Sequence, residues 1–243
     1  MNHIHAKAVW FEQQSTQPQK ACDFYSALFG WQVQTMDMGN GPYHVMDNQG
    51  ESESGITTAA KTAGWTPYFS VADVDAHQKS AQKLGATIIA PAFDLDQVGR
   101  ISVLQEPSGA VFALFAAQKG DGEDRPSREN GFHWTELWSK DAEASMAFFR
   151  DLLGYKAEKM PSPKGVYYTM LSKDGPRLGI TTSDKASSFL PYVRVAACDD
   201  SVAHGIKLGA VPTIPAMDMP GVGRFAAMLD PTGAQIGVIT PAH

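Results

Sequence analysis

The chain of 243 residues is 43% hydrophobic and 19% charged, and it carries a formal net charge of −6 at pH 7 with a pI of 5.6. This acidic balance excludes the electrostatic attraction by which basic proteins bind nucleic acids and anionic membranes. The sequence also lacks a run of about 18 apolar residues that could span a bilayer, so we expect no nucleic-acid partner and no membrane partner.

The first half of the chain reads as strand, helix and three strands, followed by the same succession again. An apolar run at 9–12 predicts the first strand, and apolar residues at helical spacing predict a helix over 18–28 that ends at Gly30. A second helix is predicted between Asp73, a suitable N-cap, and Gly85. Turn residues separate the remaining predicted strands, which include 43–46, 68–71, 101–104 and 111–114.

The second half repeats the first at a fixed offset of 124 residues, which is the separation between Glu12 and Glu136. At this offset the Gly-Ile-Thr-Thr segment at 55–58 recurs at 179–182. Self-similarity over roughly 100 residues indicates two tandem domains rather than a solenoid. We therefore predict a first domain at residues 1–118, a polar linker containing Gly and Pro at 119–130, and a second domain at 131–243.

Two motifs of the repeat resemble those of a known superfamily. Residues 21–31 (ACDFYSALFGW) are similar to a helix end of the vicinal oxygen chelate superfamily, and residues 148–155 are the second copy. The turn at 230–234 (DPTGA) resembles a turn of the same superfamily, which includes glyoxalase I, bleomycin-resistance proteins and extradiol dioxygenases. The resemblance implies an α+β fold of two tandem glyoxalase-like domains, each built from two βαβββ modules that form an open barrel-like cavity.

The resemblance also implies where a metal would bind, and the sequence departs from that pattern. Members of the superfamily carry a His at the start of a first strand and a Glu seven residues after the Asp of the turn. The corresponding positions here hold other residues, namely Trp10, Thr66 and Ala113 in the first half and Trp134, Leu190 and Gly237 in the second. These side chains are not metal ligands, so we predict no metal cofactor and disfavour iron-dependent extradiol dioxygenation.

Glu136 and Glu12 are the predicted catalytic residues. Each follows a tryptophan by two positions, so strand alternation places Trp134 with Glu136, and Trp10 with Glu12, on one strand face. A carboxylate in a partly apolar cavity can act as a general base or as a hydrogen-bond acceptor for a ligand. The alternative is a structural carboxylate that is bonded to backbone or paired with an arginine.

Arginine and aromatic side chains are the predicted substrate-binding residues. Arg100 and Arg224 can bind an anionic ligand through paired hydrogen bonds, or they can form salt bridges, with Glu12 and Glu136 as candidate partners. The aromatic candidates can line a cavity or belong to the core; they are Trp10, Tyr43, Tyr68, Trp134, Trp138, Tyr167 and Tyr192. Trp138 has no aromatic twin, because Gln14 occupies the matching position, and this favours the second half as the working site.

Two classes of function remain open from the sequence. The first is an enzyme, a lyase or isomerase that uses a cavity glutamate as base on a small oxygenated or electrophilic metabolite. The second is non-catalytic binding and sequestration of a small molecule, as in resistance proteins. In both cases the partner is a small-molecule ligand, and we expect a monomer or homodimer. Cys22 and Cys198 are not twins and no signal-peptide pattern is evident, so we predict a reduced, cytoplasmic protein.

Overall fold

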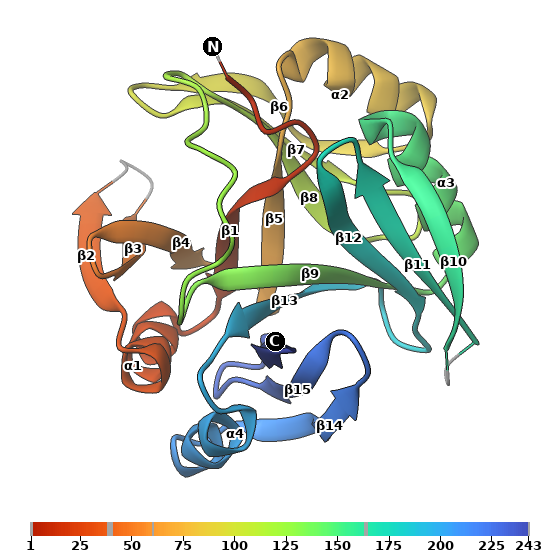
Figure 1. The fold of residues 1–243 in the computed structure, drawn as a ribbon. Coiled ribbons are helices and arrows are strands. Elements are labelled where there is room, and N and C mark those ends of the chain that lie inside the picture. The colour runs from red at the N-terminus through yellow and green to blue at the C-terminus, as the bar shows by residue number, and fades with distance from the viewer. Residues whose placement is uncertain (1, 38–40, 60, 163–164, 243) are drawn as a thin grey trace. The chain divides into compact units, whose positions relative to one another are not determined.

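The computed structural model describes residues 2–37, 41–59, 61–162 and 165–242 (Figure 1). Within these ranges four helices and sixteen strands form four copies of one succession, a strand, a helix and three strands. The α+β class and the four βαβββ modules are therefore confirmed. None of the helices in the described ranges is long and apolar enough to cross a membrane.

The two modules of the first half follow the predicted order closely. The first module consists of β1 (Ala8–Ser15), α1 (Pro18–Phe29), β2 (Gln32–Asp37), β3 (Pro42–Asn48) and β4 (Glu51–Thr58). The second module consists of β5 (Gly64–Ser70), α2 (Val74–Lys83), β6 (Thr87–Leu95), β7 (Gly99–Gln105) and β8 (Val111–Ala117).

The second half repeats both modules. The third module consists of β9 (Phe132–Ser139), α3 (Ala142–Leu153), β10 (Lys156–Ser162), β11 (Gly165–Ser172) and β12 (Gly175–Thr182). The fourth consists of β13 (Ser188–Arg194), α4 (Cys198–Lys207), β14 (Val211–Met219), β15 (Gly223–Leu229) and β16 (Gln235–Pro241).

The helix boundaries have local causes that the sequence already contains. Asp73 caps α2, because its Oδ1 accepts the backbone N–H of Ala76 at 2.9 Å. α1 ends at Gly30, whose φ of 73° is a left-handed conformation that glycine adopts without strain. α3 ends in the same way at Gly154, with φ 69°. The predicted N-cap at Asp73 and the helix end at Gly30 are confirmed.

Each module pairs its first strand with its last in parallel, while its other strands pair as antiparallel hairpins. This register places one large polar residue of the first strand beside a very small residue of the last strand in every module. The four pairs are Glu12 with Gly55, Tyr68 with Ala113, Glu136 with Gly179, and Tyr192 with Gly237.

The chain forms two compact units, and neither coincides with one half of the sequence. Unit 1 contains residues 1–10, 66–125 and 135–189, whereas unit 2 contains residues 11–65, 126–134 and 190–243. Unit 1 thus joins most of the second and third modules, and unit 2 joins most of the first and fourth. The ranges 1–118 and 131–243 describe the duplication of the sequence, whereas each compact unit contains segments from both halves.

The core of unit 1 is aromatic and lies beneath α2 and α3, which run side by side in Figure 1. Phe69, Phe112 and Phe149 are each buried and contact one another through tilted or edge-on rings. Such ring pairs stabilise a core beyond the area that they bury. The buried carboxylate of Glu106 accepts the backbone N–H of Ala110 at 3.0 Å, which fixes the turn between β7 and β8.

The core of unit 2 is also aromatic, and it contains a polar network. Tyr25 of α1 packs edge-on against Trp65, and its hydroxyl donates to Asp230 at 2.8 Å. Gln13 donates to the same carboxylate oxygen at 2.5 Å. Burial, together with the charge of Asp230, raises the pKa of Tyr25 well above its usual value. Asp230 therefore connects the turn before β16 to the first module.

The predicted linker has neither helix nor strand, but side-chain contacts hold it in place within each unit. In unit 1 Asp124 forms a salt bridge of 2.6 Å with Arg177, whose side chain is 6% exposed. The pKa of Asp124 lies below its ordinary value, because the hydrogen bonds and charges of Arg177 and Lys7 outweigh the opposing effect of desolvation. In unit 2 Arg128 binds Glu53 at 2.9 Å.

Candidate functional site

The β9 strand presents a polar and aromatic face. Its burial alternates, with Trp134, Glu136 and Trp138 half-buried, while Thr135 and Leu137 between them are fully buried. The period of two in a strand explains this division, because successive side chains point to opposite faces. The predicted sharing of one face by Trp134 and Glu136 is confirmed, and Trp138 joins them.

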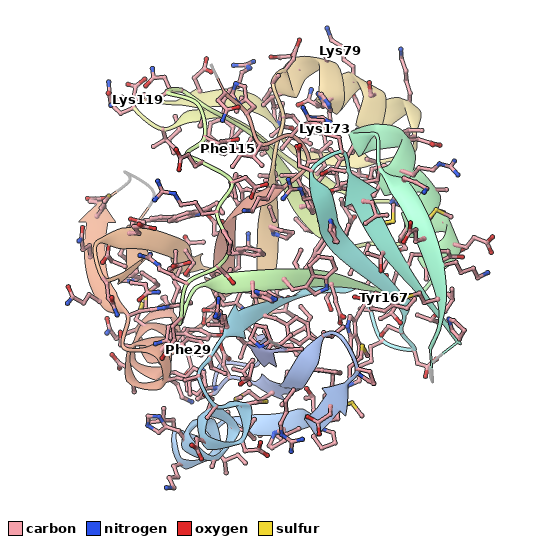
Figure 2. All side chains as sticks on the ribbon, viewed as in Figure 1. Phe29, Lys79, Phe115, Lys119, Tyr167 and Lys173 are labelled. Atoms are coloured by element: carbon pink, nitrogen blue, oxygen red, sulfur yellow. The ribbon has the colours of Figure 1, made fainter. Side chains whose placement is uncertain are left out.

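Two neutral donors bind the carboxylate of Glu136, one on each oxygen. The Tyr167 hydroxyl of β11 donates to Oε1 at 2.9 Å, and the Trp138 indole Nε1–H donates to Oε2 at 2.9 Å. Figure 2 labels Tyr167. Hydrogen bonds from donors of this kind orient the carboxylate group. The third module thus holds a carboxylate, a phenol and an indole together.

Gly179 of β12 makes the contact between Tyr167 and Glu136 possible. A Cβ atom at Gly179 would lie 2.1 Å from the Tyr167 hydroxyl and 3.1 Å from Cγ of Glu136. The first distance is far shorter than any real carbon contact, so the phenol occupies the space that a side chain would fill. Gly55 and Tyr43 repeat the arrangement in the first module, where the distance from the Cβ position to the hydroxyl is 1.9 Å.

The β1 strand carries the twin face. Trp10 and Glu12 are half-buried and Gln14 is exposed, whereas Phe11 and Gln13 between them are buried. The predicted sharing of one face by Trp10 and Glu12 is therefore confirmed. The twin faces differ at two positions, where Ala8 and Gln14 of β1 correspond to Phe132 and Trp138 of β9.

Tyr68 and Tyr192 occupy packed positions in the second and fourth modules. Tyr68 is 8% exposed and clusters with Ile101 and Ala113, against which Trp10 also packs. Tyr192 is 3% exposed; its ring lies 2.3 Å from the Cβ position of Gly237 and meets Phe225 edge-on. Both rings therefore fill the space beside a small residue, which is the packing role that the sequence left open for them.

The arginines have aspartate partners, which corrects our choice of the glutamates as candidates for their salt bridges. Arg100 binds Asp75 through Nε at 2.6 Å and Nη2 at 2.9 Å, and its Nη1 lies 3.0 Å from Asp94. Its hydrogen bonds lower the pKa of Asp75 below the ordinary range. A guanidinium with all three nitrogens engaged in this way anchors the start of α2 to the β6–β7 hairpin.

Arg224 repeats the same anchor in the fourth module. It binds Asp199 at the start of α4 through Nε at 2.5 Å and Nη2 at 2.9 Å, and its Nη1 lies 2.9 Å from Asp218 of β14. All three residues are twins, at the repeat offset, of the residues in the Arg100 anchor. The duplication therefore preserves these ion pairs as part of the scaffold.

The residues at the metal positions implied by the superfamily do not fit a metal. Ala113 and Gly237 have no donor atom in their side chains, and the ring of Tyr192 occupies the space beside Gly237. Within the described ranges no three or more His, Cys, Asp or Glu side chains gather so as to hold an ion. The polar atoms that the third module offers instead are the carboxylate of Glu136 and the donors of Tyr167 and Trp138.

Sequence reasoning missed the glycines as part of the site. Gly55 and Gly179 open the repeated Gly-Ile-Thr-Thr segments, which we used only as evidence of duplication. A glycine in the interior of a strand weakens the strand and often marks the close approach of another group. That signal, present at both twin positions, was sufficient to nominate them.

Residues 9–115 match the family described as a glyoxalase-like domain. The first half of the chain is thus similar to a glyoxalase-like domain. The resemblance to the vicinal oxygen chelate superfamily is thereby confirmed, and the repeat extends the same module structure through the second half.

Relatives of similar length are found in Mycobacterium and Streptomyces. The chain is 28% identical over 245 residues to the Mycobacterium tuberculosis protein named "Putative glyoxylase CFP32", covering 96% of this chain and 94% of that protein. It is 28% identical over 253 residues to "Anthracycline biosynthesis protein DauV" of Streptomyces sp. (strain C5), covering 95% of this chain and 91% of the relative.

A solved structure shows the same fold. The Mn(II)-bound glyoxalase from Novosphingobium aromaticivorans superposes with a TM-score of 0.72 at 16% identity, covering 98% of this chain and 83% of that one. At this identity the match establishes the arrangement of strands and helices, and the chemistry must be argued from the residues themselves.

Proposed function

We propose that the face of β9 binds a small oxygenated or electrophilic metabolite, that Glu136 is its general base, and that the reaction is of the lyase or isomerase type. The observation that carries this proposal is the carboxylate of Glu136, held by Tyr167 and Trp138 on a half-buried strand face. A carboxylate fixed by hydrogen bonds meets the geometric requirement for proton transfer, which is a defined position within reach of the ligand.

The aromatic neighbours of Glu136 fit an organic ligand. Trp134 and Trp138 lie on either side of it along the same face of β9. Indole rings offer apolar contact area together with one polar N–H group, and pockets for small molecules combine such surfaces with a few placed polar groups. The DauV name connects one relative with the biosynthesis of an organic compound, which supports a ligand of this general kind.

The proposed reaction proceeds without the superfamily's metal. The supporting observation is the set of side chains at the expected ligand positions, of which Gly237 and Ala113 offer no donor atom. A base and hydrogen-bond donors therefore have to supply the chemistry. The proton leaves a carbon or oxygen of the ligand and is received by the Glu136 carboxylate, and it returns from there to the rearranged product.

Sequestration is the second candidate function, and a specific observation favours it. The two donors hold the carboxylate of Glu136 as a hydrogen-bond acceptor between Trp134 and Trp138. A protein that only holds its ligand needs a good acceptor between aromatic surfaces, and it needs no turnover.

A screen in two stages separates the two functions. Protein treated with a chelator is mixed with small carbonyl, hydroxycarbonyl and aromatic metabolites, and binding is detected as a rise in melting temperature. Each bound compound is then incubated with the protein in D2O, and loss of its carbon-bound proton signals is followed by NMR. Exchange or turnover that Glu136→Gln abolishes supports the enzyme, binding without either supports sequestration, and binding to no compound contradicts both.

A further inference from the structure

Gly179 has no backbone reason to be glycine. It lies within β12, between Glu136 of β9 and Thr169 of β11 in the ladder, and it does not belong to the glycines with positive φ. Any L-residue can adopt its backbone conformation, and β-branched residues would favour a strand more strongly. The requirement at this position is therefore the absence of a side chain.

The atoms that would meet a side chain at Gly179 belong to the site. The nearest are the Tyr167 hydroxyl at 2.1 Å and Cζ of the same ring at 2.7 Å, followed by Cγ of Glu136 at 3.1 Å. An added methyl group would therefore displace the phenol from the position in which it donates to Oε1 of Glu136. The ring cannot yield without moving its hydroxyl, because both atoms lie at the end of a rigid side chain.

We propose that Gly179 is a positioning residue of the Glu136 site: its missing side chain lets the Tyr167 phenol lie on the sheet and fix the carboxylate that meets the ligand. The proposal rests on the proposed function for the role of Glu136 toward a ligand. The series of contacts from Gly179 through Tyr167 and Glu136 to Trp138 can be measured without a ligand.

The twin module supplies a matched control. Gly55 lies beneath Tyr43 as Gly179 lies beneath Tyr167, so alanine at either position creates a comparable clash. The indole donor is present only at Trp138, since Gln14 occupies the twin position. Gly179→Ala should therefore disturb the Trp138 indole, whereas Gly55→Ala should lower stability to a similar degree and leave that indole unchanged.

The experiment uses the full chain labelled with 15N-tryptophan. Five tryptophans give five indole N–H resonances, and the loss of one resonance in Trp138→Phe assigns Trp138. We expect the Trp138 resonance to shift in Gly179→Ala and also in Tyr167→Leu, which leaves the glycine in place and guards against misfolding of the alanine variant. A Trp138 resonance that stays unmoved in both variants, or that shifts equally in Gly55→Ala, would overturn the proposal.

A double-mutant cycle gives a second readout. Leucine at position 167 has no atom where the Tyr167 hydroxyl and Cζ lie, so Gly179→Ala should lower the denaturation midpoint less in the Tyr167→Leu background than in the wild type. Equal losses in both backgrounds would mean that the glycine serves another neighbour. A ligand screen without hits would contradict the proposed function, and the two readouts of the Gly179 proposal would remain valid. If a ligand is found whose binding or turnover needs Glu136, but Gly179→Ala and Tyr167→Leu are not coupled, only the role of Gly179 is contradicted.

Discussion

The faces of β9 and β1 show how a duplicated scaffold can keep its central residues and diverge at the positions that flank them. Both faces carry a tryptophan and then a glutamate, and in both a tyrosine of the neighbouring hairpin lies over a glycine. At the next outward position β9 has Trp138, which binds the second oxygen of Glu136, whereas β1 has the exposed Gln14. The difference indicates that the Gly–Tyr arrangement is inherited scaffold and that the indole is the specific addition of the third module.

The arginine anchors, in contrast, are preserved between the two halves. Arg100 binds Asp75 and Asp94, and Arg224 binds the two aspartates at the matching positions of the second half, at nearly the same distances. Conserved twin contacts of this kind are expected where a residue supports the fold of its own module. The preserved ion pairs therefore belong to the scaffold, whereas Trp138 distinguishes the face of β9 from that of β1.

The largest expected effect comes from removing the base on one face only. Once a ligand is identified, Glu136→Gln should reduce proton exchange or turnover by about 10²–10⁴-fold, which is the usual contribution of a general base. Glu12→Gln should leave the rate nearly unchanged, because Glu12 belongs to the face of β1 and the proposed base lies on β9. Rates measured by NMR at saturating ligand test the pair, and a larger loss in Glu12→Gln would move the site to β1.

The second prediction makes the β9 face resemble the β1 face. Trp138→Gln removes the N–H donor on Oε2 of Glu136, and a hydrogen bond to a charged group contributes about 1.5–3 kcal/mol. We expect ligand affinity to fall by about one to two orders of magnitude, and the denaturation midpoint to fall as well, because the same hydrogen bond stabilises the folded chain. Trp138→Phe separates the two contributions of the ring, because it keeps the stacking area and loses the donor; unchanged affinity in both variants would exclude Trp138 from the site.

The third prediction tests whether the two glycines are equivalent in the scaffold. Gly55→Ala and Gly179→Ala should each lower the free energy of unfolding by about 1–3 kcal/mol, the usual cost of forcing an extra methyl group into a packed position. Chemical denaturation of both variants measures the difference. Loss of stability in only one variant would show that one tyrosine can move aside, and the Gly–Tyr arrangement would then no longer be common to both faces.

The smallest expected effect concerns the arginine anchors, and it depends on pH. Hydrogen bonds from Arg100 and Arg224 lower the pKa of Asp75 and Asp199 below the ordinary value of 3.8. A carboxyl group whose pKa is lowered in the folded state stabilises that state at every pH above the ordinary pKa of the group. This contribution is lost as the pH falls through the lowered pKa. Arg100→Gln and Arg224→Gln should therefore be slightly less stable than the wild type at pH 7, and the difference should vanish in strong acid.

Denaturation midpoints measured at pH 7 and in a series of acidic buffers check this prediction. The side chains are partly exposed and the effect is screened by salt, so both variants should differ less from the wild type in high salt. A pH-independent loss would mean that the arginine stems, rather than their charges, hold α2 and α4 in place.

The sequence by itself determined the duplication, the module order and much of the helix boundaries. These features are local: Asp73 caps a helix through its own backbone neighbourhood, Gly30 ends one through a left-handed φ, and strand alternation fixes which residues share a face with Glu136. Each follows from interactions between residues a few positions apart, so the order of residues suffices to predict them.

Only the tertiary structure decided which side chains meet. Arg100 binds Asp75, 25 residues away in the sequence, and Glu136 accepts a hydrogen bond from Tyr167, 31 residues away. Strand register and hairpin pairing bring these residues together. The compact units likewise combine modules from both halves, a choice that a repeat with two equivalent copies leaves open. Alternation gives the direction of a side chain, but its partner depends on the packing of distant strands. For this reason the partners of the arginines, and the tyrosine that lies over Gly179, emerged only from the fold.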